Sequence, residues 1–250
     1  MIRAAPVRGC LVALLALGCG CERRAADTSR RDAGPAPSQA PSRPAAAAAV
    51  EAKASSRDPS WPCTSSFAQG GVVTERARFV YQDSPKRCSF PPDVDVFGCP
   101  SEEQELTADG ALKRTLRFEY DPAGNVVSLA YVAKSGQTTT TLRYERDAKG
   151  LSRMTVIGPD GAPHGGNRYT KTADGFAREQ LDERGNVVRK ASYHYDERGL
   201  LKSAEVDHGA DGTIDVRMRN TFDGARVVRT DDVDGAGKSL GVATYAYDCP

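Results

Sequence analysis

Three aspartates spaced four residues apart come closest to a metal site in this chain. Asp207, Asp211 and Asp215 would supply oxygens at positions 1, 5 and 9 of a loop, and calcium binds where several oxygens converge. Gly209 stands at position 3 and Met218 at position 12, where a calcium loop places further oxygen ligands. An Asp-Gly pair is also typical of a tight hairpin turn. Calcium binding and a hairpin turn therefore both stay open, and no other cofactor is expected.

The residues that commonly carry catalysis do not form a recognisable constellation. His164, His194 and His208 are the three histidines, and none stands at a triad-like spacing from Asp, Ser or Cys. No pair among the 33 acidic residues is singled out by its spacing. The glycines are spaced as turns and do not cluster ahead of a helix, as a phosphate-binding loop would require. We therefore expect no catalytic residues and a protein that is not an enzyme.

The seven cysteines fall into two groups. Cys63, Cys88, Cys99 and Cys249 lie in the part expected to fold, and the other three lie in the N-terminal region that precedes Glu22. An even set of four in an exported protein predicts two disulfides, with three connectivities open. A zinc site is the competing interpretation, although the chain has no CxxC pair. If the penultimate residue Cys249 pairs with one of the others, the sheet must close or residues 61–100 must cross to its far edge.

The N-terminal region, up to Cys21, has the layout of an export signal. Two arginines are followed by an apolar run over residues 11–17 and by small residues, and the run is too short to span a bilayer. The segment Ala16-Leu17-Gly18-Cys19 resembles the lipobox of bacterial lipoproteins. This resemblance implies a signal peptide over residues 1–18, a lipid on Cys19 and a place in the cell envelope, with the outer membrane expected. Cys21 is the second candidate for the lipid, and an ordinary secretory signal with a secreted protein is the alternative.

Residues 19–60 are predicted to be a disordered tether. The stretch 25–60 is rich in Ala, Ser and Pro and has no aromatic residue. A segment so poor in large apolar groups cannot offset its chain entropy by burial. The tether would hold a folded domain away from the membrane surface.

From about residue 106 the chain repeats itself. Glycine-centred turn signals recur roughly every 12 residues between Gly110 and Gly235, with strand-like residues between them. Four of these turns are Asp-x-x-Gly, and the Asp-Gly turns favour type I′ geometry. Aromatic residues mark a longer period of about 25 residues. They are Tyr120, Tyr144, Tyr169, Tyr195, Phe222 and Tyr247.

This pattern predicts an all-β domain over residues 106–250. In the best strands the side chains alternate, with Leu116, Phe118 and Tyr120 on one face and charged residues on the other. We expect an antiparallel meander of about twelve short strands in hairpin repeats of about 25 residues, curled or barrel-like. Residues 61–105, with three cysteines, are expected to form an irregular cap.

Several of the turns resemble a known family. The segments FEYDPAGNVV (118–127), LDERGNVV (181–188), YHYDERGLL (193–201) and YAYD (245–248) are similar to YD repeats, the modules of RHS-type proteins. The resemblance covers roughly residues 106–250 and implies β-hairpins laid side by side in a curling sheet. Encapsulation of a toxic cargo, a role of large RHS proteins, does not transfer to about five or six repeats. Binding of a carbohydrate or a cell surface is what the resemblance suggests.

Composition limits the partners. The formal net charge is +1, so no whole-protein field attracts nucleic acid, and a mean hydropathy of −0.50 excludes a multi-pass membrane bundle. We expect a membrane-tethered lipoprotein whose β domain is a non-catalytic binding or structural module, with a glycan or an envelope protein as partner and no nucleic acid. An accessory or immunity-like partner of a secreted system is the alternative, followed by an envelope hydrolase.

Overall fold

The computed structural model describes residue 58 and residues 61–81, 84–85, 87–92 and 98–248. The predicted signal peptide, Cys19 and nearly all of the tether lie outside these residues. The secondary-structure elements of these residues are all strands, joined by turns and irregular segments. The strands are β1 (Thr64–Gln69), β2 (Val72–Val80), β3 (Glu102–Thr107), β4 (Leu112–Tyr120), β5 (Val126–Ala133), β6 (Thr138–Asp147), β7 (Gly150–Ile157), β8 (Pro163–Lys171), β9 (Gly175–Leu181), β10 (Val187–Tyr195), β11 (Leu201–Asp207), β12 (Val216–Asp223), β13 (Arg226–Asp234) and β14 (Ser239–Ala246).

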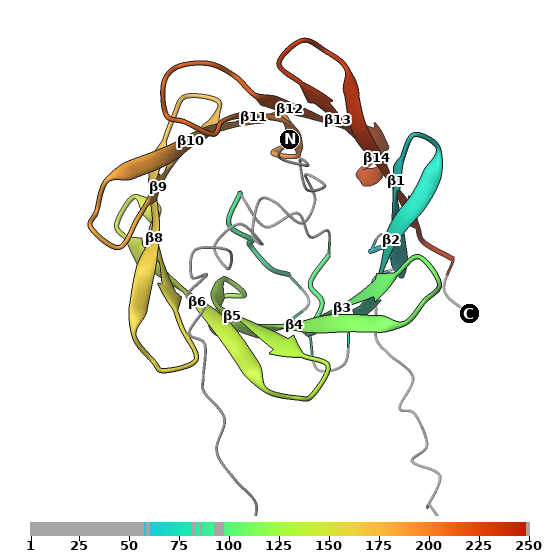
Figure 1. Ribbon diagram of the computed structural model, residues 1–250, viewed down its shortest axis with the longest axis horizontal. Coiled ribbons are helices and arrows are strands. Elements are labelled where there is room, and N and C mark those ends of the chain that lie inside the picture. The colour runs from blue at the N-terminus through green and yellow to red at the C-terminus, as the bar shows by residue number, and fades with distance from the viewer. Residues whose placement is uncertain (1–57, 59–60, 82–83, 86, 93–97, 249–250) are drawn as a thin grey trace, which may run out of the picture.

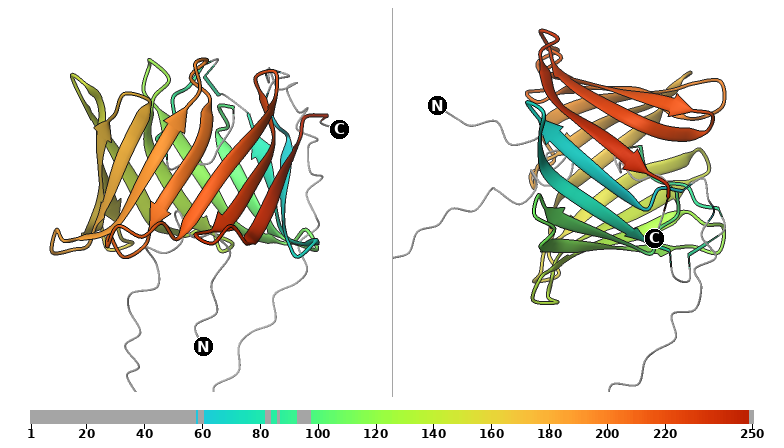
Figure 2. Two further views of the ribbon diagram at one scale, coloured as in Figure 1. Left: turned by 90° about the horizontal axis from the view of Figure 1, so that it is seen from above. Right: turned by 90° about the vertical axis from the view of Figure 1, so that its right-hand side faces the viewer.

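The strands form a closed antiparallel barrel (Figure 1). Each strand pairs with its neighbours in sequence, and β1 pairs with β14 to close the ring, with Thr64 opposite Ala246 and Phe67 opposite Ala243. The strands are tilted with respect to the barrel axis, as closure requires (Figure 2). The predicted antiparallel, barrel-like all-β fold is confirmed, and the open question of closure is answered by the pairing of β1 with β14.

One turn chemistry accounts for much of this regularity. In the β9–β10 hairpin the amide of Gly185 donates to the carbonyl of Asp182, and the amide of Asp182 donates to the carbonyl of Asn186. A carboxylate oxygen of Asp182 also accepts from the amides of Arg184 and Asn186, and Gly185 has a φ of 83°. Such a φ is strained for residues with a side chain but not for glycine. The same pair of backbone hydrogen bonds recurs around Gly110, Gly124, Gly136, Gly161, Gly185, Gly199 and Gly237.

Two details of the predicted turns are wrong. In the last hairpin the turn glycine is Gly237, with a φ of 85°, and not Gly235. Gly110 and Gly161 occupy the fourth position of a longer turn, so these Asp-Gly pairs do not form the expected two-residue type I′ loop. In both turns an aspartate, Asp109 or Asp160, directly precedes the glycine. A two-residue type I′ loop can have the same Asp-Gly pair, so the sequence alone does not distinguish it from the longer turn.

The barrel has a mainly apolar inner face, which also buries some charged side chains such as Arg178 and Asp232, and a charged outer face. In β4, Leu116 and Phe118 are buried and face the interior, whereas Arg117 is exposed. Ion pairs cross neighbouring strands on the outside, for example Arg117 with Glu102 at 2.9 Å. A barrel wall that contacts lipid carries an apolar band outward, so this wall has the opposite polarity and is suited to contact water. In the described part of the chain, no helix is long and apolar enough to cross a membrane.

The expected irregular cap over residues 61–105 is corrected by the structure. Strands β1 and β2 lie in this range and close the barrel between β14 and β3, and β3 itself begins at Glu102. The sequence pattern missed β1 because Phe67 is its only large apolar residue. The turn between β1 and β2 lacks the aspartate that most of the other hairpins have and uses Gly70 and Gly71 instead. These strands are defined by their partners more than by their own composition.

The irregular residues of this range that the structure describes lie inside the barrel. We call the described residues 84–85, 87–92 and 98–100 the inner segment, and in Figure 1 it crosses the space within the ring. Phe90 meets Phe118 and Tyr120 edge to face, with ring centroids 5.5 and 6.0 Å apart, and Ser89 forms a bridge with Asn125. Barrels much larger than eight strands leave a lumen that side chains alone do not fill. The inner segment therefore fills part of that lumen at one mouth.

Candidate functional site

The candidate site is a ring of inward-facing residues at the mouth that holds the inner segment. Each even-numbered strand from β4 to β12 ends there, just before a hairpin turn, and its last inward residue pairs with the first inward residue of the next strand. A β-bulge precedes most of these positions, as is common at barrel rims where a side chain is re-aimed. We call them the rim positions. They are Tyr120, Arg146, Lys171, Tyr195, Phe222 and, just beyond β14, Tyr247.

The rim differs from the aromatic period that the sequence suggested. Tyr144 lies opposite Met154, and Tyr169 lies opposite Arg178, one inward position deeper than the rim. In β6 and β8 the rim positions belong to Arg146 and Lys171. Two adjoining repeats therefore present a cation where four other repeats present a ring.

The rim residues from β6 onward line a cavity of about 970 Å³. This volume lies within the range of known small-molecule sites. The inner segment forms one wall of the cavity, and the ends of β6 to β13 form the opposite wall. Six aromatic rings line it, all of them partly exposed: Trp61, Phe90, Phe176, Tyr195, Phe222 and Tyr247.

Basic side chains predominate among the charged groups of the cavity. Arg87, Arg146, Lys149 and Lys171 line it, and Asp58 is the acidic residue among its described lining. Arg146 donates from Nη1 to the carbonyl oxygen of Val126 at 2.9 Å, and burial lowers the pKa of its guanidinium. A partly desolvated cation gains more from a nearby anion than a cation in water does.

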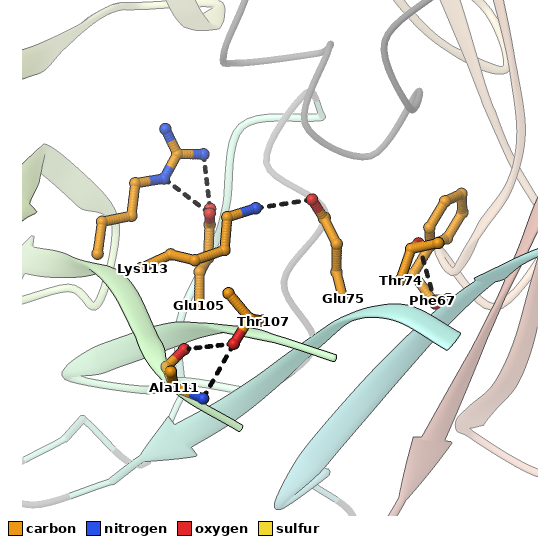
Figure 3. Close-up of polar contacts among 8 residues, drawn as sticks. Phe67, Thr74, Glu75, Glu105, Thr107, Ala111 and Lys113 are labelled. Carbon is orange, nitrogen blue, oxygen red and sulfur yellow. Dashed lines mark hydrogen bonds and ion pairs between the residues drawn. The ribbon is translucent and has the colours of Figure 1, made fainter. Parts of the chain in front are cut away.

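The cavity cations differ from those at the opposite mouth. There, Lys113 binds Glu75 at 2.8 Å, and the guanidinium of its neighbour in β4 binds Glu105 at 2.7 Å (Figure 3). In the part of the chain that the structure describes, Arg87, Lys149 and Lys171 form no ion pair. The cavity therefore holds positive charge that the described residues do not neutralise.

Hydrogen bonds from two tyrosines hold the edge of the site in place. Tyr120 donates its hydroxyl to the carbonyl oxygen of Pro100 at 2.6 Å, which fastens the inner segment to β4. Tyr247 donates to the carbonyl oxygen of Val227 at 2.7 Å, and burial raises the pKa of this hydroxyl to about 12. Both hydroxyls thus act as donors to backbone at neutral pH. The cavity wall is built on strand ends and anchored rings, which suits a preformed site.

The aspartates considered for calcium lie at the other mouth, where Asp207 ends β11 and Asp211 and Asp215 lie in the loop before β12. Asp207 accepts from the amides of Asp211 and Gly212 at 3.2 and 2.8 Å, and Asp215 accepts from the amide of His208 at 2.7 Å. The structure does bring these residues into one loop, but their oxygens bind the loop's own amides. No group of three or more His, Cys, Asp or Glu suited to a metal occurs among the described residues. This geometry supports the hairpin interpretation, and calcium binding stays the alternative that a measurement has to test.

The histidines are separated from one another and from the cavity. His194 lies 2.7 Å from Asp174 and His164 lies 2.8 Å from Glu183. The pKa of His164 is raised, chiefly by its hydrogen bond to Glu183. His208 is partly buried, and this burial lowers its pKa. The expected lack of a catalytic constellation stays a prediction.

The cysteines can be followed in part. Cys88 and Cys99 form a disulfide with Cα atoms 5.6 Å apart, which closes a loop within residues 84–100. Cys63 is also disulfide-bonded, and its Sγ lies 3.3 Å from the carbonyl oxygen of Tyr247. Cys249 and the cysteines of the N-terminal region lie outside the described residues.

Sequence reasoning missed the rim cations. Arg146 and Lys171 each follow a repeat tyrosine by two residues, a spacing that keeps a strand residue on the same face. That relation is visible in the sequence. The sequence does not show how deep in the barrel each position lies, because this depth depends on the strand pairing.

Comparisons with known proteins give a likeness of shape only. No family model and no curated protein matches the chain. Among solved structures it is similar to a porin-like protein from Bacteroides uniformis (8% identity, 76% of this chain and 98% of that one, TM-score 0.39). It is also similar to a porin-like protein from Bacteroides vulgatus (10% identity, 76% and 99% covered, TM-score 0.41). A further match is TcdB2-TccC3-TEV (14% identity, 70% of this chain but 11% of that one, TM-score 0.27). These values carry no argument about function, and the fold rests on the strand pairing itself.

Proposed function

We propose that the chain is an exported, lipid-tethered protein of the cell envelope whose barrel is a non-catalytic binding module. The observation that carries this proposal is the cavity of about 970 Å³ at one mouth, walled by six partly exposed rings. Rings that are partly open to solvent offer stacking surfaces to a ligand at small cost in side-chain entropy, because two χ angles define each ring. A glycan or another envelope molecule is the ligand class that this wall suits.

The barrel gives such a site a rigid frame. Tyr195 and Phe222 stand at the ends of strands that are paired on both sides, so their backbones are held by the sheet. The guanidinium of Arg198 lies 5.7 Å from the ring centroid of Phe222, and that of Arg226 lies 5.2 Å from the ring centroid of Tyr247. These cation–π contacts restrict the rings further. A preformed pocket of this kind is the usual frame of a binding site.

Binding at the cavity can be tested with a glycan array and a pull-down from envelope extract. The double variant Tyr195→Ala/Phe222→Ala should lose at least about tenfold in affinity for any ligand that the parent binds, since each stacked ring contributes on the order of 1 kcal/mol or more. Val188→Ala changes an exposed outer side chain of β10 and serves as the matched control. Unchanged binding by the double variant, with a native circular dichroism spectrum, would move the site elsewhere. If the pull-down captures a single protein, and the double variant still captures it, the partner binds the outer wall of the barrel. That result would favour the accessory-partner alternative.

The tether has a separate test. Metabolic labelling with an alkyne-bearing fatty acid should mark the parent chain and the Cys21→Ala variant but not Cys19→Ala. The charged outer wall of the barrel supports this arrangement, because it gives the domain no apolar band of its own to insert in a bilayer. Label retained by Cys19→Ala and lost by Cys21→Ala would move the lipid to the second cysteine.

A further inference from the structure

The rim gathers cations and rings into one patch on adjoining strands. Lys171 at the end of β8 lies opposite Phe176 of β9, and Phe176 meets Tyr195 of β10 edge to face, with centroids 6.3 Å apart. Arg146 occupies the preceding rim position, two strands away, which is roughly 10 Å. All four side chains line the cavity. Two cationic side chains are therefore followed by two aromatic rings around this part of the mouth.

The charge of this patch is available to a ligand. Lys149 and Lys171 are exposed, and neither pairs with a carboxylate among the described residues. Arg146 donates from one nitrogen to the carbonyl of Val126, and the carboxylate of Asp121 lies close enough to balance part of its charge. Its site is partly desolvated, so an anion there is screened less by water and salt than one on the outer wall.

Resting on the binding role proposed above, we propose that this mouth selects a ligand that carries an anionic group on a ring. Arg146 and Lys171 bind the anion, and Phe176 and Tyr195 bind the flat face of the ring. An acidic sugar and an aromatic acid share this chemistry. The cations make the site selective, because a neutral ring would meet the same aromatic wall without the charge-assisted hydrogen bonds.

Two pairs of probes separate charge from ring. Anilinonaphthalene sulfonate and phenylnaphthylamine share their rings but differ in the anion, and trigalacturonate and galactotriose form the corresponding sugar pair. Dissociation constants are measured by fluorescence for the dyes and by calorimetry for the sugars. The anionic member of at least one pair should bind at least about tenfold more tightly than its neutral partner, the size expected for one charge-assisted hydrogen bond.

Variants assign that difference to the rim. Lys171→Gln should reduce affinity for the anionic probe about tenfold and leave the neutral probe unchanged, and added salt should weaken the parent more than the variant. Lys134→Gln is the matched control, because Lys134 is an exposed lysine in a hairpin turn at the other mouth. Arg146→Gln is a second variant, read together with its thermal stability because Arg146 also binds backbone.

The outcomes distinguish this inference from the proposed function. If neutral and anionic probes bind equally and Lys171→Gln changes neither, the site binds rings and the anion proposal is wrong. If an anion binds but Lys134→Gln weakens it as much as Lys171→Gln does, the charge acts from the whole surface and the rim assignment is wrong. If none of the four probes binds and the glycan array also shows no signal, both the anion proposal and the binding role proposed for this mouth are wrong.

Discussion

The seam that closes the barrel depends on a glycine. Gly241 of β14 and the buried ring of Phe67 in β1 lie on the inner face of the two strands that close the ring. A Cβ at position 241 would lie 3.0 Å from Cε1 of Phe67 and closer still to two other atoms of that ring. The ring is 1% exposed and packs with Val227, Ala243 and Tyr245, so it has little room to move.

Replacement of this glycine should therefore destabilise the pairing of β1 with β14. Gly241→Ala is expected to lower the free energy of unfolding by about 1–3 kcal/mol, the usual cost of overpacking a core. Phe67→Ala alone removes a buried ring and is expected to cost about 3–5 kcal/mol. In the double variant the new methyl group occupies space that the ring has left, so the clash disappears. The double variant should be more stable than the sum of the single losses by about 1–3 kcal/mol.

Equilibrium unfolding in urea measures these changes. The fluorescence of Trp61 reports on the seam, because Trp61 is the only tryptophan of the chain and stands just before β1. Ser239→Ala, an exposed position at the start of β14, is the control and should change stability by less than about 0.5 kcal/mol. Additive losses in the double variant, or a Gly241→Ala variant as stable as the parent, would refute the ring's position against β14.

Three further measurements test other parts of the structure. Peptide mapping without reduction should join Cys63 to Cys249, because the Sγ of Cys63 lies 3.3 Å from the carbonyl of Tyr247, close in sequence to Cys249; a free thiol at Cys249 would contradict this. The pKa of Asp182 is lowered by hydrogen bonds from Asn186, so its turn contributes stability above the ordinary value of 3.8 and loses it as the pH falls through the folded pKa. Asp182→Ala should accordingly lower the Tm at pH 7 but not near pH 2, and equal losses at both would exclude a role for the charge. Calcium should leave the Tm unchanged because the oxygens of Asp207 are used by backbone amides, and a rise with calcium but not magnesium would restore the metal interpretation.

The predictable part of the fold is the part whose information is local. Alternation of Leu116 and Phe118 with charged residues indicates a strand without knowledge of its partner, and the Asp182-x-x-Gly185 turn carries its own hydrogen bonds. Strands β1 and β2 could not be recognised in this way. Phe67 becomes a core residue only because β14 lies beside it, and its partner Ala243 stands near the opposite end of the described chain. Burial of the inner segment is likewise a property of the closed ring.

The rim shows why the site could be identified only from the structure, whereas the repeat could be identified from the sequence. A two-residue step along a strand keeps a side chain on the same face but moves it roughly 7 Å along the barrel wall. The repeat tyrosines Tyr144 and Tyr195 therefore look equivalent in sequence, whereas Tyr195 lies at the rim and Tyr144 lies one inward position deeper, below Arg146. Aromatic spacing selects the inner face, and the strand register then selects depth. Because binding depends on which group reaches the mouth, it is Arg146 and Lys171, the two rim positions without a ring, that distinguish this barrel's mouth from a uniform aromatic one.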